Sequence, residues 1–145
     1  MDLKEFISLA DNEKIVAAIK EAELNTSGEI RVHIESTCKS NPYDRAVYIF
    51  NYLKMYKTVA RNGVLIYVAV KSQKFAIIGD EGINNAVPDD FWDKIKAKMA
   101  SDFCRQHYAE GLKTAILTAG ESLKRYFPYK SDDINEQPDE ISFGK

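Results

Sequence analysis

The sequence predicts an α/β protein, a three-layer α-β-α sandwich around a small mixed β-sheet. Three observations lead to this fold class. Expected helices and strands follow one another in the order α-β-α-β-β-α-α. Residues 64–70 are apolar throughout, which is typical of a central strand buried on both faces. The helix between the first two strands makes them parallel through a right-handed crossover, and the third strand returns as the second arm of a hairpin.

The chain begins with an expected helix at residues 12–24, after a shorter helical piece at 3–9. Asp11 suits the N-cap position of the longer helix, because its carboxylate can accept hydrogen bonds from the first free backbone N–H groups. A stop signal follows at 25–28, Asn-Thr-Ser-Gly. The apolar residues of this helix recur at helical spacing: Ile15, Ile19 and Ala22.

A first strand is expected at residues 29–36. Apolar and polar residues alternate here, so one face of the strand is expected in the core and the other is polar, which fits an edge strand or a half-covered face of the sheet. We interpret His33 as a strand-face histidine that meets solvent or a carboxylate, rather than as a catalytic group. The inward set is Ile30, Val32 and Ile34, and the polar set is Arg31, His33 and Glu35.

Two more strands and three more helices complete the expected fold. The Asn62-Gly63 pair marks the turn into the central strand. Proline suits the first position of a helix, and Asp89 and Asp90 suit the positive end of the same helix dipole. The expected elements are a helix at 43–55, strands at 64–70 and 74–79, a helix that begins near Pro88, and a helix at 108–126.

Length and composition indicate one domain at residues 1–128, followed by an acidic tail at 129–145 that we expect to be flexible. The chain has 145 residues, of which 45% are hydrophobic and 29% charged, as in ordinary globular domains. A net charge of −2 excludes a general electrostatic footprint for nucleic acid. There is no signal-peptide pattern and no apolar run of membrane-spanning length. We therefore expect a cytoplasmic monomer without insertion into a membrane.

An acidic loop at residues 79–90 is the most informative segment for function. It reads Gly-Asp-Glu-Gly-Ile-Asn-Asn-Ala-Val-Pro-Asp-Asp. Like charges this close repel one another unless a cation, a helix N-terminus or solvent relieves them. The loop is therefore either a metal or ligand site, or a solvated loop in which Asp89 and Asp90 cap the next helix and Asp80 satisfies turn amides.

The expected topology brings further residues to this loop. The two parallel strands start at one end of the sheet and the third strand ends there, so their polar end residues are expected on one rim. Carboxylate, hydroxyl, amide and carbonyl oxygens suit Ca²⁺ or Mg²⁺ better than Zn²⁺. An EF-hand is excluded, because a register from Asp80 puts Asn85 where that loop needs glycine and Phe91 where it needs glutamate. The residues expected on the rim are Ser27, Glu29, Thr58, Arg61, Asn62, Asp80, Glu81, Asp89 and Asp90.

Several segments of the chain resemble the TPM domain family. They are residues 26–33 (Thr-Ser-Gly-Glu-Ile-Arg-Val-His), 58–67 (Thr-Val-Ala-Arg-Asn-Gly-Val-Leu-Ile-Tyr) and 74–83 (Lys-Phe-Ala-Ile-Ile-Gly-Asp-Glu-Gly-Ile), with later matches up to Phe127-Pro128. The resemblance covers residues 6–128 and implies a Rossmann-like α/β sandwich. Many members carry an export signal and a membrane tail, which we do not expect here. Some members bind calcium at the acidic rim. By resemblance, the metal residues would be Asp80, Glu81, Asp89 and Asn62, with Glu29, Thr58, Arg61 and Asp90 as supporting residues.

The family also includes a thylakoid-lumen acid phosphatase, so two alternatives to a cation-binding domain stay open. One is a metal-dependent phosphatase acting on phosphomonoesters, in which the cation polarises a phosphate oxygen and Arg61 holds another. The other is a protein-interaction or assembly module without metal. No standard phosphatase motif is present: Cys38 and Arg45 are one residue too far apart for a Cys-x5-Arg loop. We predict a domain that binds Ca²⁺, or alternatively Mg²⁺, with no catalytic residue assigned.

Overall fold

One four-stranded sheet forms the centre of the molecule, with the strand order β3-β2-β1-β4. The computed structural model describes residue 5, residues 12–129, residue 139 and residues 141–144. Glu29 lies opposite Gly63 where β1 and β2 pair in parallel, and β3 is antiparallel to β2. The central position predicted for the apolar strand is thereby confirmed. The strands are β1 (Glu29–Glu35), β2 (Gly63–Ala69), β3 (Lys74–Gly79) and β4 (Ser142–Phe143).

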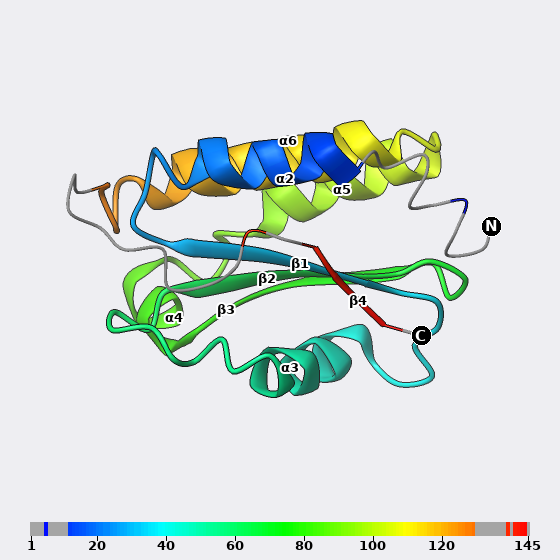
Figure 1. Cartoon of the computed structure of the whole chain (residues 1–145), viewed down its shortest axis with the longest axis horizontal. Helices are drawn as coiled ribbons and strands as arrows, with labels where there is room; N and C mark the ends of the chain where they lie inside the picture. Colours follow the sequence, from blue (N-terminus) through cyan, green and yellow to red (C-terminus); the bar gives the residue numbers. More distant parts are fainter. Residues whose placement is uncertain (1–4, 6–11, 130–138, 140, 145) are drawn as a thin grey trace.

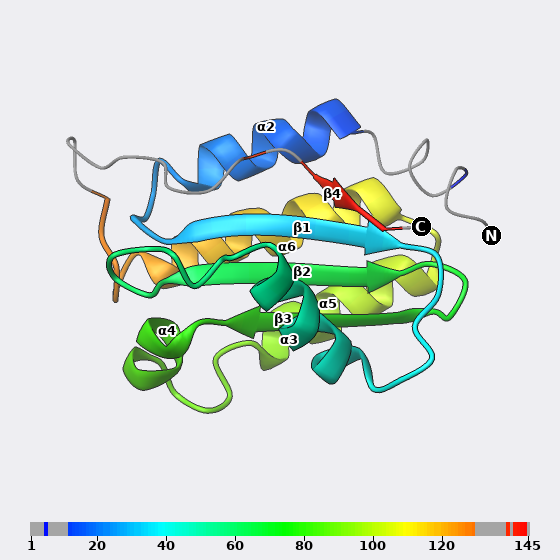
Figure 2. The ribbon, with the colours of Figure 1, turned by 60° about the horizontal axis from the view of Figure 1, so that its bottom comes forward.

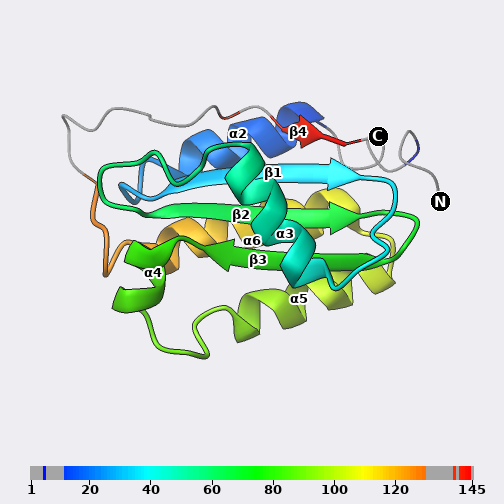
Figure 3. The same cartoon turned by 90° about the horizontal axis from the view of Figure 1, so that it is seen from below.

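Helices cover both faces of this sheet, which confirms the three-layer prediction. Figure 1 shows α2, α5 and α6 above the sheet and α3 below it. From below, α3 crosses the strands diagonally (Figure 3). A short helix, α4, continues from the end of β3 (Figure 2). The upper layer contains α2 (Asn12–Ala22), α5 (Asp93–Cys104) and α6 (Tyr108–Leu123); α3 is Pro42–Tyr52 and α4 is Glu81–Ala86.

The apolar central strand divides its side chains between two cores. Val64, Ile66 and Val68 join the larger core, beneath α2, α5 and α6. Leu65 and Tyr67 join the smaller core, with residues of α3. Because successive strand residues point to opposite faces, a strand covered by helices on both sides has no position left for a solvent-facing polar residue.

The alternating strand β1 differs from its prediction on one face. Its polar face was expected to be half-covered, but His33 and Glu35 are only 4% and 3% exposed. Hydrogen bonds explain the difference: Arg45 from α3 and Tyr67 from β2 both donate to Glu35. A buried charge is tolerated when it is paired and hydrogen-bonded in this way.

The acidic loop also contains a helix that its sequence did not predict. Asp80 is the N-cap of α4, which ends before Pro88. Proline disfavours the helical conformation in the preceding residue, and Val87 is extended, with φ −104° and ψ 155°. The expected helix start at Pro88 is therefore wrong, and α5 begins only at Asp93.

The C-terminal segment differs from the expected flexible tail in its last described part. Ser142 and Phe143 pair in parallel with His33 and Ile34 of β1, and Ile141 is buried in the larger core. A backbone hydrogen bond from Gly144 to Ile34 continues this pairing. Residues 141–144 therefore pack against β1, within the segment that was expected to be a flexible tail. The predicted helix at 3–9 lies outside the described residues except for residue 5, and the Asp11 cap lies outside them entirely.

Candidate functional site

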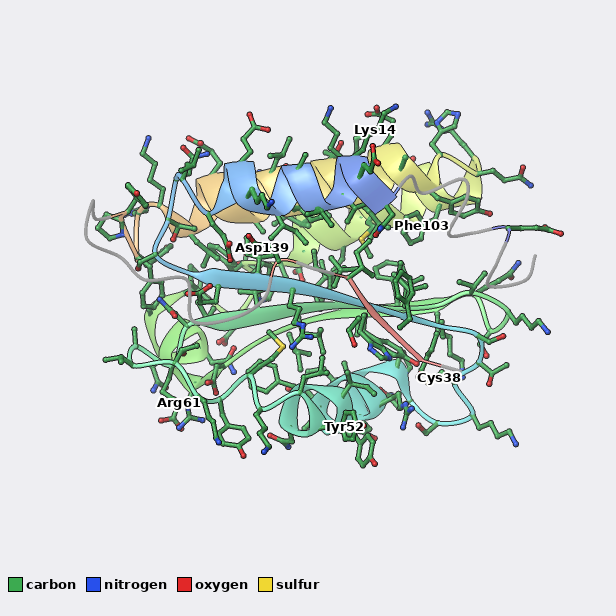
Figure 4. The ribbon with its side chains drawn as sticks, in the orientation of Figure 1. Lys14, Cys38, Tyr52, Arg61, Phe103 and Asp139 are labelled. Carbon is green, nitrogen blue, oxygen red and sulfur yellow. The ribbon has the colours of Figure 1, made fainter. Side chains whose placement is uncertain are left out.

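The start of the parallel strands carries a polar cluster that we name the rim site. It lies at the left end of the sheet in Figure 1, beside α4, and Arg61 is labelled there in Figure 4. The topology brings its members together because β1 and β2 start at this end and β3 ends here. The rim site consists of Thr58, Arg61, Asn62, Asp80 and Glu81.

Asp80 and Arg61 form the centre of the rim site. Arg61 Nε donates to Asp80 Oδ2 at 2.7 Å, and Nη2 donates to Oδ1 at 2.9 Å. The Glu81 N–H also donates to Asp80 Oδ1, at 2.8 Å, because Asp80 caps α4. The carboxylate is 6% exposed and the Arg61 side chain 40% exposed. The hydrogen bond to Asp80 raises the pKa of the Arg61 guanidinium above its ordinary value.

Asn62 connects the rim site to the first strand. Its backbone N–H donates to Thr58 Oγ1 at 3.2 Å, and its side-chain nitrogen donates to the Ser27 carbonyl at 3.2 Å. The Glu29 N–H donates to the Asn62 carbonyl, also at 3.2 Å. Glu29 thus reaches the rim site through its backbone. Within the described residues, no hydrogen bond to the side-chain oxygen of Asn62 is found.

Close backbone packing holds α4 against the segment that carries Arg61. A Cβ atom at Gly82 would lie 2.2 Å from the Ala60 carbonyl oxygen and 2.6 Å from that of Arg61, so only glycine fits. The Gly82 N–H donates to the Arg61 carbonyl at 2.9 Å. Arg61 itself has a positive φ of 50°, an uncommon conformation for a residue with a side chain. The two backbones therefore fix where Arg61 meets Asp80.

The other acidic residues predicted for the rim site lie farther from Arg61 than Asp80 does. Glu81 lies 3.4 Å from Arg61 Nη1. Asp89 and Asp90 are exposed in the turn before α5, and within the part of the chain that is described no hydrogen bond or ion pair joins either side chain to the rim site. They do not cap α5 either, because its N-cap is Trp92, without a side-chain hydrogen bond. Their capping role is thus wrong, and their role in a cation site stays a prediction.

The oxygen ligands of the rim site suit a hard cation, but they are not already arranged around a metal position. Carboxylate and amide oxygens are the ligands that Ca²⁺ and Mg²⁺ prefer. Arg61 engages both carboxylate oxygens of Asp80, however. Among the described residues, no group of three or more His, Cys, Asp or Glu side chains is placed to hold a metal ion. A cation at Asp80 would therefore have to replace the guanidinium.

A second polar cluster, which sequence reasoning missed, lies at the other end of the same strands. Glu35 receives Arg45 Nε at 2.8 Å and Arg45 Nη2 at 2.9 Å, together with the Tyr67 hydroxyl. Burial raises the pKa of Tyr67 above its ordinary value, and the hydrogen bond to Glu35 raises it further. Tyrosine within the otherwise aliphatic central strand was the available signal, since a buried hydroxyl needs a partner.

His33 joins this second cluster to the C-terminal strand. His33 Nε2 lies 3.4 Å from Glu35 Oε1, and Nδ1 lies 3.0 Å from Ser142 Oγ. Burial lowers the pKa of His33 below its ordinary value, although Glu35 acts in the opposite direction. The carboxylate partner agrees with the interpretation of His33 from the sequence. With these partners taken, the second cluster is a closed structural network rather than an open site.

The fold and the rim site together define a small α/β sandwich domain with an arginine–carboxylate centre at the start of its parallel strands. The chain belongs to the TPM domain family, whose model matches residues 1–122. This match confirms the resemblance seen in the sequence. No curated protein matches the chain. None of the described helices is long and apolar enough to cross a membrane.

Two solved structures are similar to the chain over most of its length. The NMR structure of the BA42 protein from the psychrophilic bacterium Bizionia argentinensis is 50% identical, covers 92% of each chain and has a TM-score of 0.87. The N-terminal domain of a P. gingivalis protein is 17% identical, covers 84% of this chain and 89% of its own, and has a TM-score of 0.62. The second likeness concerns the fold alone.

Proposed function

We propose that this TPM domain binds a divalent cation at the rim site, and that Ca²⁺ is the ion its oxygen donors suit best. The observation that carries the proposal is the buried Asp80 carboxylate, whose positive partner is the partly exposed guanidinium of Arg61. Asp80 and Glu81 would supply carboxylate oxygens, and Asn62 its amide oxygen. Asp89 would join them from the neighbouring turn. The calcium binding implied by the family resemblance agrees with this donor set.

Replacement of Arg61 by a cation is energetically reasonable. A buried carboxylate requires a positive partner, but the partner can be a side chain or an ion. Arg61 is 40% exposed, so its guanidinium can move into water without being buried elsewhere. The guanidinium end of this ion pair faces water, where solvent screening weakens the attraction. A divalent ion with several oxygen ligands can therefore compete with the guanidinium for Asp80.

Competition predicts opposite effects for the two central residues. We expect Asp80→Asn to abolish cation binding, because it removes the buried charge. We expect Arg61→Gln to increase the Ca²⁺ affinity, because the guanidinium then no longer competes with the ion for the Asp80 oxygens. The measurement is a calorimetric Ca²⁺ titration after chelator treatment, with backbone amide NMR shifts to locate the ion. Asp44→Asn, an exposed acid at the start of α3, is the matched control and should bind like the wild type.

The same samples separate the competing functions. Shifts at residues 61–63 and 80–82 that disappear in Asp80→Asn would support the cation site, whereas an unchanged affinity in Asp80→Asn would overturn it. Hydrolysis of a generic phosphomonoester in the presence of Ca²⁺ or Mg²⁺, lost in Asp80→Asn and in chelator, would instead assign the phosphatase alternative to the rim site. Binding without turnover favours a cation-binding module.

A further inference from the structure

A cavity of about 420 Å³ lies at the opposite end of the strands from the rim site. One side is formed by the end of β2 and the start of β3, and the other by the corner between α5 and α6. Figure 4 places Phe103, which lines the cavity, between the helix layer and the sheet. The volume falls within the range of about 300–1,000 Å³ that is usual for small-molecule sites. The cavity is therefore large enough for an organic ligand.

Three half-buried aromatic rings make an apolar wall in this cavity. The rings of Phe75 and Phe103 meet edge to face, with centroids 5.9 Å apart, and Tyr108 is tilted against Phe103 at 5.6 Å. Gly111 allows this packing, because a Cβ atom there would lie 2.8 Å from the Phe103 ring. The rings hold one another in place before any ligand arrives. A fixed aromatic wall favours a flat apolar group, which gains contact area without having to order the site.

The charged groups on this cavity are positive. Lys71 and Lys74 line it, and no carboxylate belongs to the part of its wall that the structure describes. Lys74 Nζ donates to the carbonyl oxygens of Cys38 and Ser40, at 3.1 Å each, so its ammonium group already has two acceptors that do not belong to the cavity wall. The exposed Lys71 is the more available of the two cations. A ligand with a negative group is favoured at such a mouth.

Two glutamines in an uncommon backbone conformation also line the cavity. Gln73 has φ 54° and Gln106 has φ 62°. Gln106 follows the end of α5, a position where glycine is usual because it adopts positive φ without a steric penalty. Glutamine there costs about 1–2 kcal/mol more than glycine would, and it keeps an amide that can both donate and accept hydrogen bonds. Strained residues of this kind often gather at binding sites.

We propose that this cavity binds a small organic anion with a flat apolar body. The apolar body packs against Phe75, Phe103 and Tyr108, while its acidic group meets Lys71 and accepts from the amides of Gln73 and Gln106. This inference does not depend on the cation site, since no residue of the rim site lines the cavity.

A matched pair of fluorescent probes tests the proposal on the full chain. Anilinonaphthalene sulfonate has a flat apolar body with an anionic group, and N-phenyl-naphthylamine has the same rings without the charge. We expect saturable binding of one sulfonate probe per chain. Ala100→Leu, which fills the cavity from α5, should weaken both probes at least tenfold. Lys71→Gln should weaken only the anionic probe, by about tenfold, the ratio that 1.4 kcal/mol represents. Lys57→Gln, an exposed lysine outside the cavity, is the control.

Each outcome decides the proposal. It is overturned if Ala100→Leu leaves the affinity of the anionic probe unchanged, or if Lys57→Gln weakens that probe as much as Lys71→Gln does. Equal binding of the two probes to the wild type would overturn the requirement for an anion. Amide NMR shifts at Gln73 and Gln106, rather than at residues 80–82, separate this site from the rim site. Circular dichroism melting of each variant verifies that it is folded.

Discussion

Asp80 and Glu35 are two buried carboxylates with different sets of hydrogen-bond partners. Each receives two hydrogen bonds from one arginine, and Arg61 and Arg45 are similarly exposed, at 40% and 35%. Glu35 has the Tyr67 hydroxyl and His33 in addition, whereas the further contact of Asp80 is a backbone N–H. Glu35 is therefore saturated by side chains on several sides. Among the described residues, Arg61 is the cationic side chain paired with Asp80, and its guanidinium is partly exposed, which is the physical reason for placing ligand exchange at the rim site.

Glu35→Gln should change how stability depends on pH. Burial raises the pKa of Glu35, but hydrogen bonds from Arg45 and Tyr67 outweigh it, so the net pKa lies below its ordinary value. A depressed folded-state pKa stabilises the protein above the unfolded value of about 4.3, and this stabilisation is lost as the pH falls through the folded value. We expect the variant to be roughly 2–3 kcal/mol less stable at pH 7, with a flatter decline below about pH 4. Urea unfolding across this range is the measurement. Glu110→Gln, an exposed acid, should keep the wild-type slope.

Glu23→Gln should have the opposite effect and stabilise the protein. Burial and a hydrogen bond with Asp139 raise the pKa of Glu23 to about 10. A raised folded-state pKa gives stability that is complete below the unfolded value of about 4.3 and is lost as the pH rises towards the folded value. Glutamine keeps a donor for Asp139 and an acceptor for the Ile30 N–H without needing a proton. We expect a gain of several kcal/mol at pH 8 and none at pH 4. An equal gain at both values would contradict the protonated carboxyl.

At the scale of single residues, sequence could identify the rim site but not these carboxyl pairs. Arg61, Asn62 and Asp80 stand beside recognisable strand ends, so topology alone predicts that they meet. Glu23 and Asp139 are distant in sequence, and only the return of the C-terminal segment past β1 brings them together. Figure 4 shows Asp139 between α2 and β1. Because the sequence did not predict where the C-terminal segment packs, nothing in the residues around Glu23 or Asp139 indicated that the two carboxyl groups would meet.

At the scale of elements, the short pieces were the ones missed. Helix α4 has six residues and one buried apolar residue, Ile83, so it shows no helical periodicity. Its signals were Asp80 as N-cap and Pro88 as a limit, which also fit a loop. Strand β4 has two residues, and the buried apolar residue beside it in the described part of the C-terminal segment is Ile141. Longer elements with a strong apolar pattern, such as the continuous apolar run of β2 and the helical spacing of α6, were predicted to within a few residues.

Gly144→Ala should release the C-terminal strand from β1. A Cβ atom at Gly144 would lie 2.6 Å from both Cβ and Oε1 of Glu35, so the strand cannot keep its place beside this buried side chain. We expect amide hydrogen exchange at Gly144, whose N–H donates to Ile34, to become at least tenfold faster, because local opening exposes that bond. Ser142→Ala is the matched variant, since it removes only the hydrogen bond to His33 and should have a smaller effect. Unchanged protection in Gly144→Ala would show that β4 is not held by this close approach.

At the scale of the whole molecule, the three-layer fold was predictable because its constraints are few and strong. A strand that is apolar throughout lies in the centre of the sheet, and a helix between two parallel strands makes a right-handed crossover. The second strand of a hairpin pairs with the first. These rules place β1, β2 and β3, and with them the rim. The same rules do not determine whether a carboxylate on that rim pairs with an arginine or binds an ion. That depends on side-chain positions, which α4 and the backbone of Arg61 set.

Ca²⁺ should raise the thermal stability of the whole domain if the rim site binds it. A ligand that binds only the native state stabilises it by RT ln(1 + [L]/Kd), about 2.7 kcal/mol at one hundred times Kd. For a domain of this length such a gain raises Tm by roughly 6–10 °C. We expect this rise between chelator-treated and Ca²⁺-saturated protein by calorimetry, and its absence in Asp80→Asn. Arg61→Gln should start from a lower Tm in chelator, because Asp80 is then buried without a cation, and should gain more on Ca²⁺ addition than the wild type. A Tm that does not respond to Ca²⁺ in any of the three proteins would favour the metal-free interaction module.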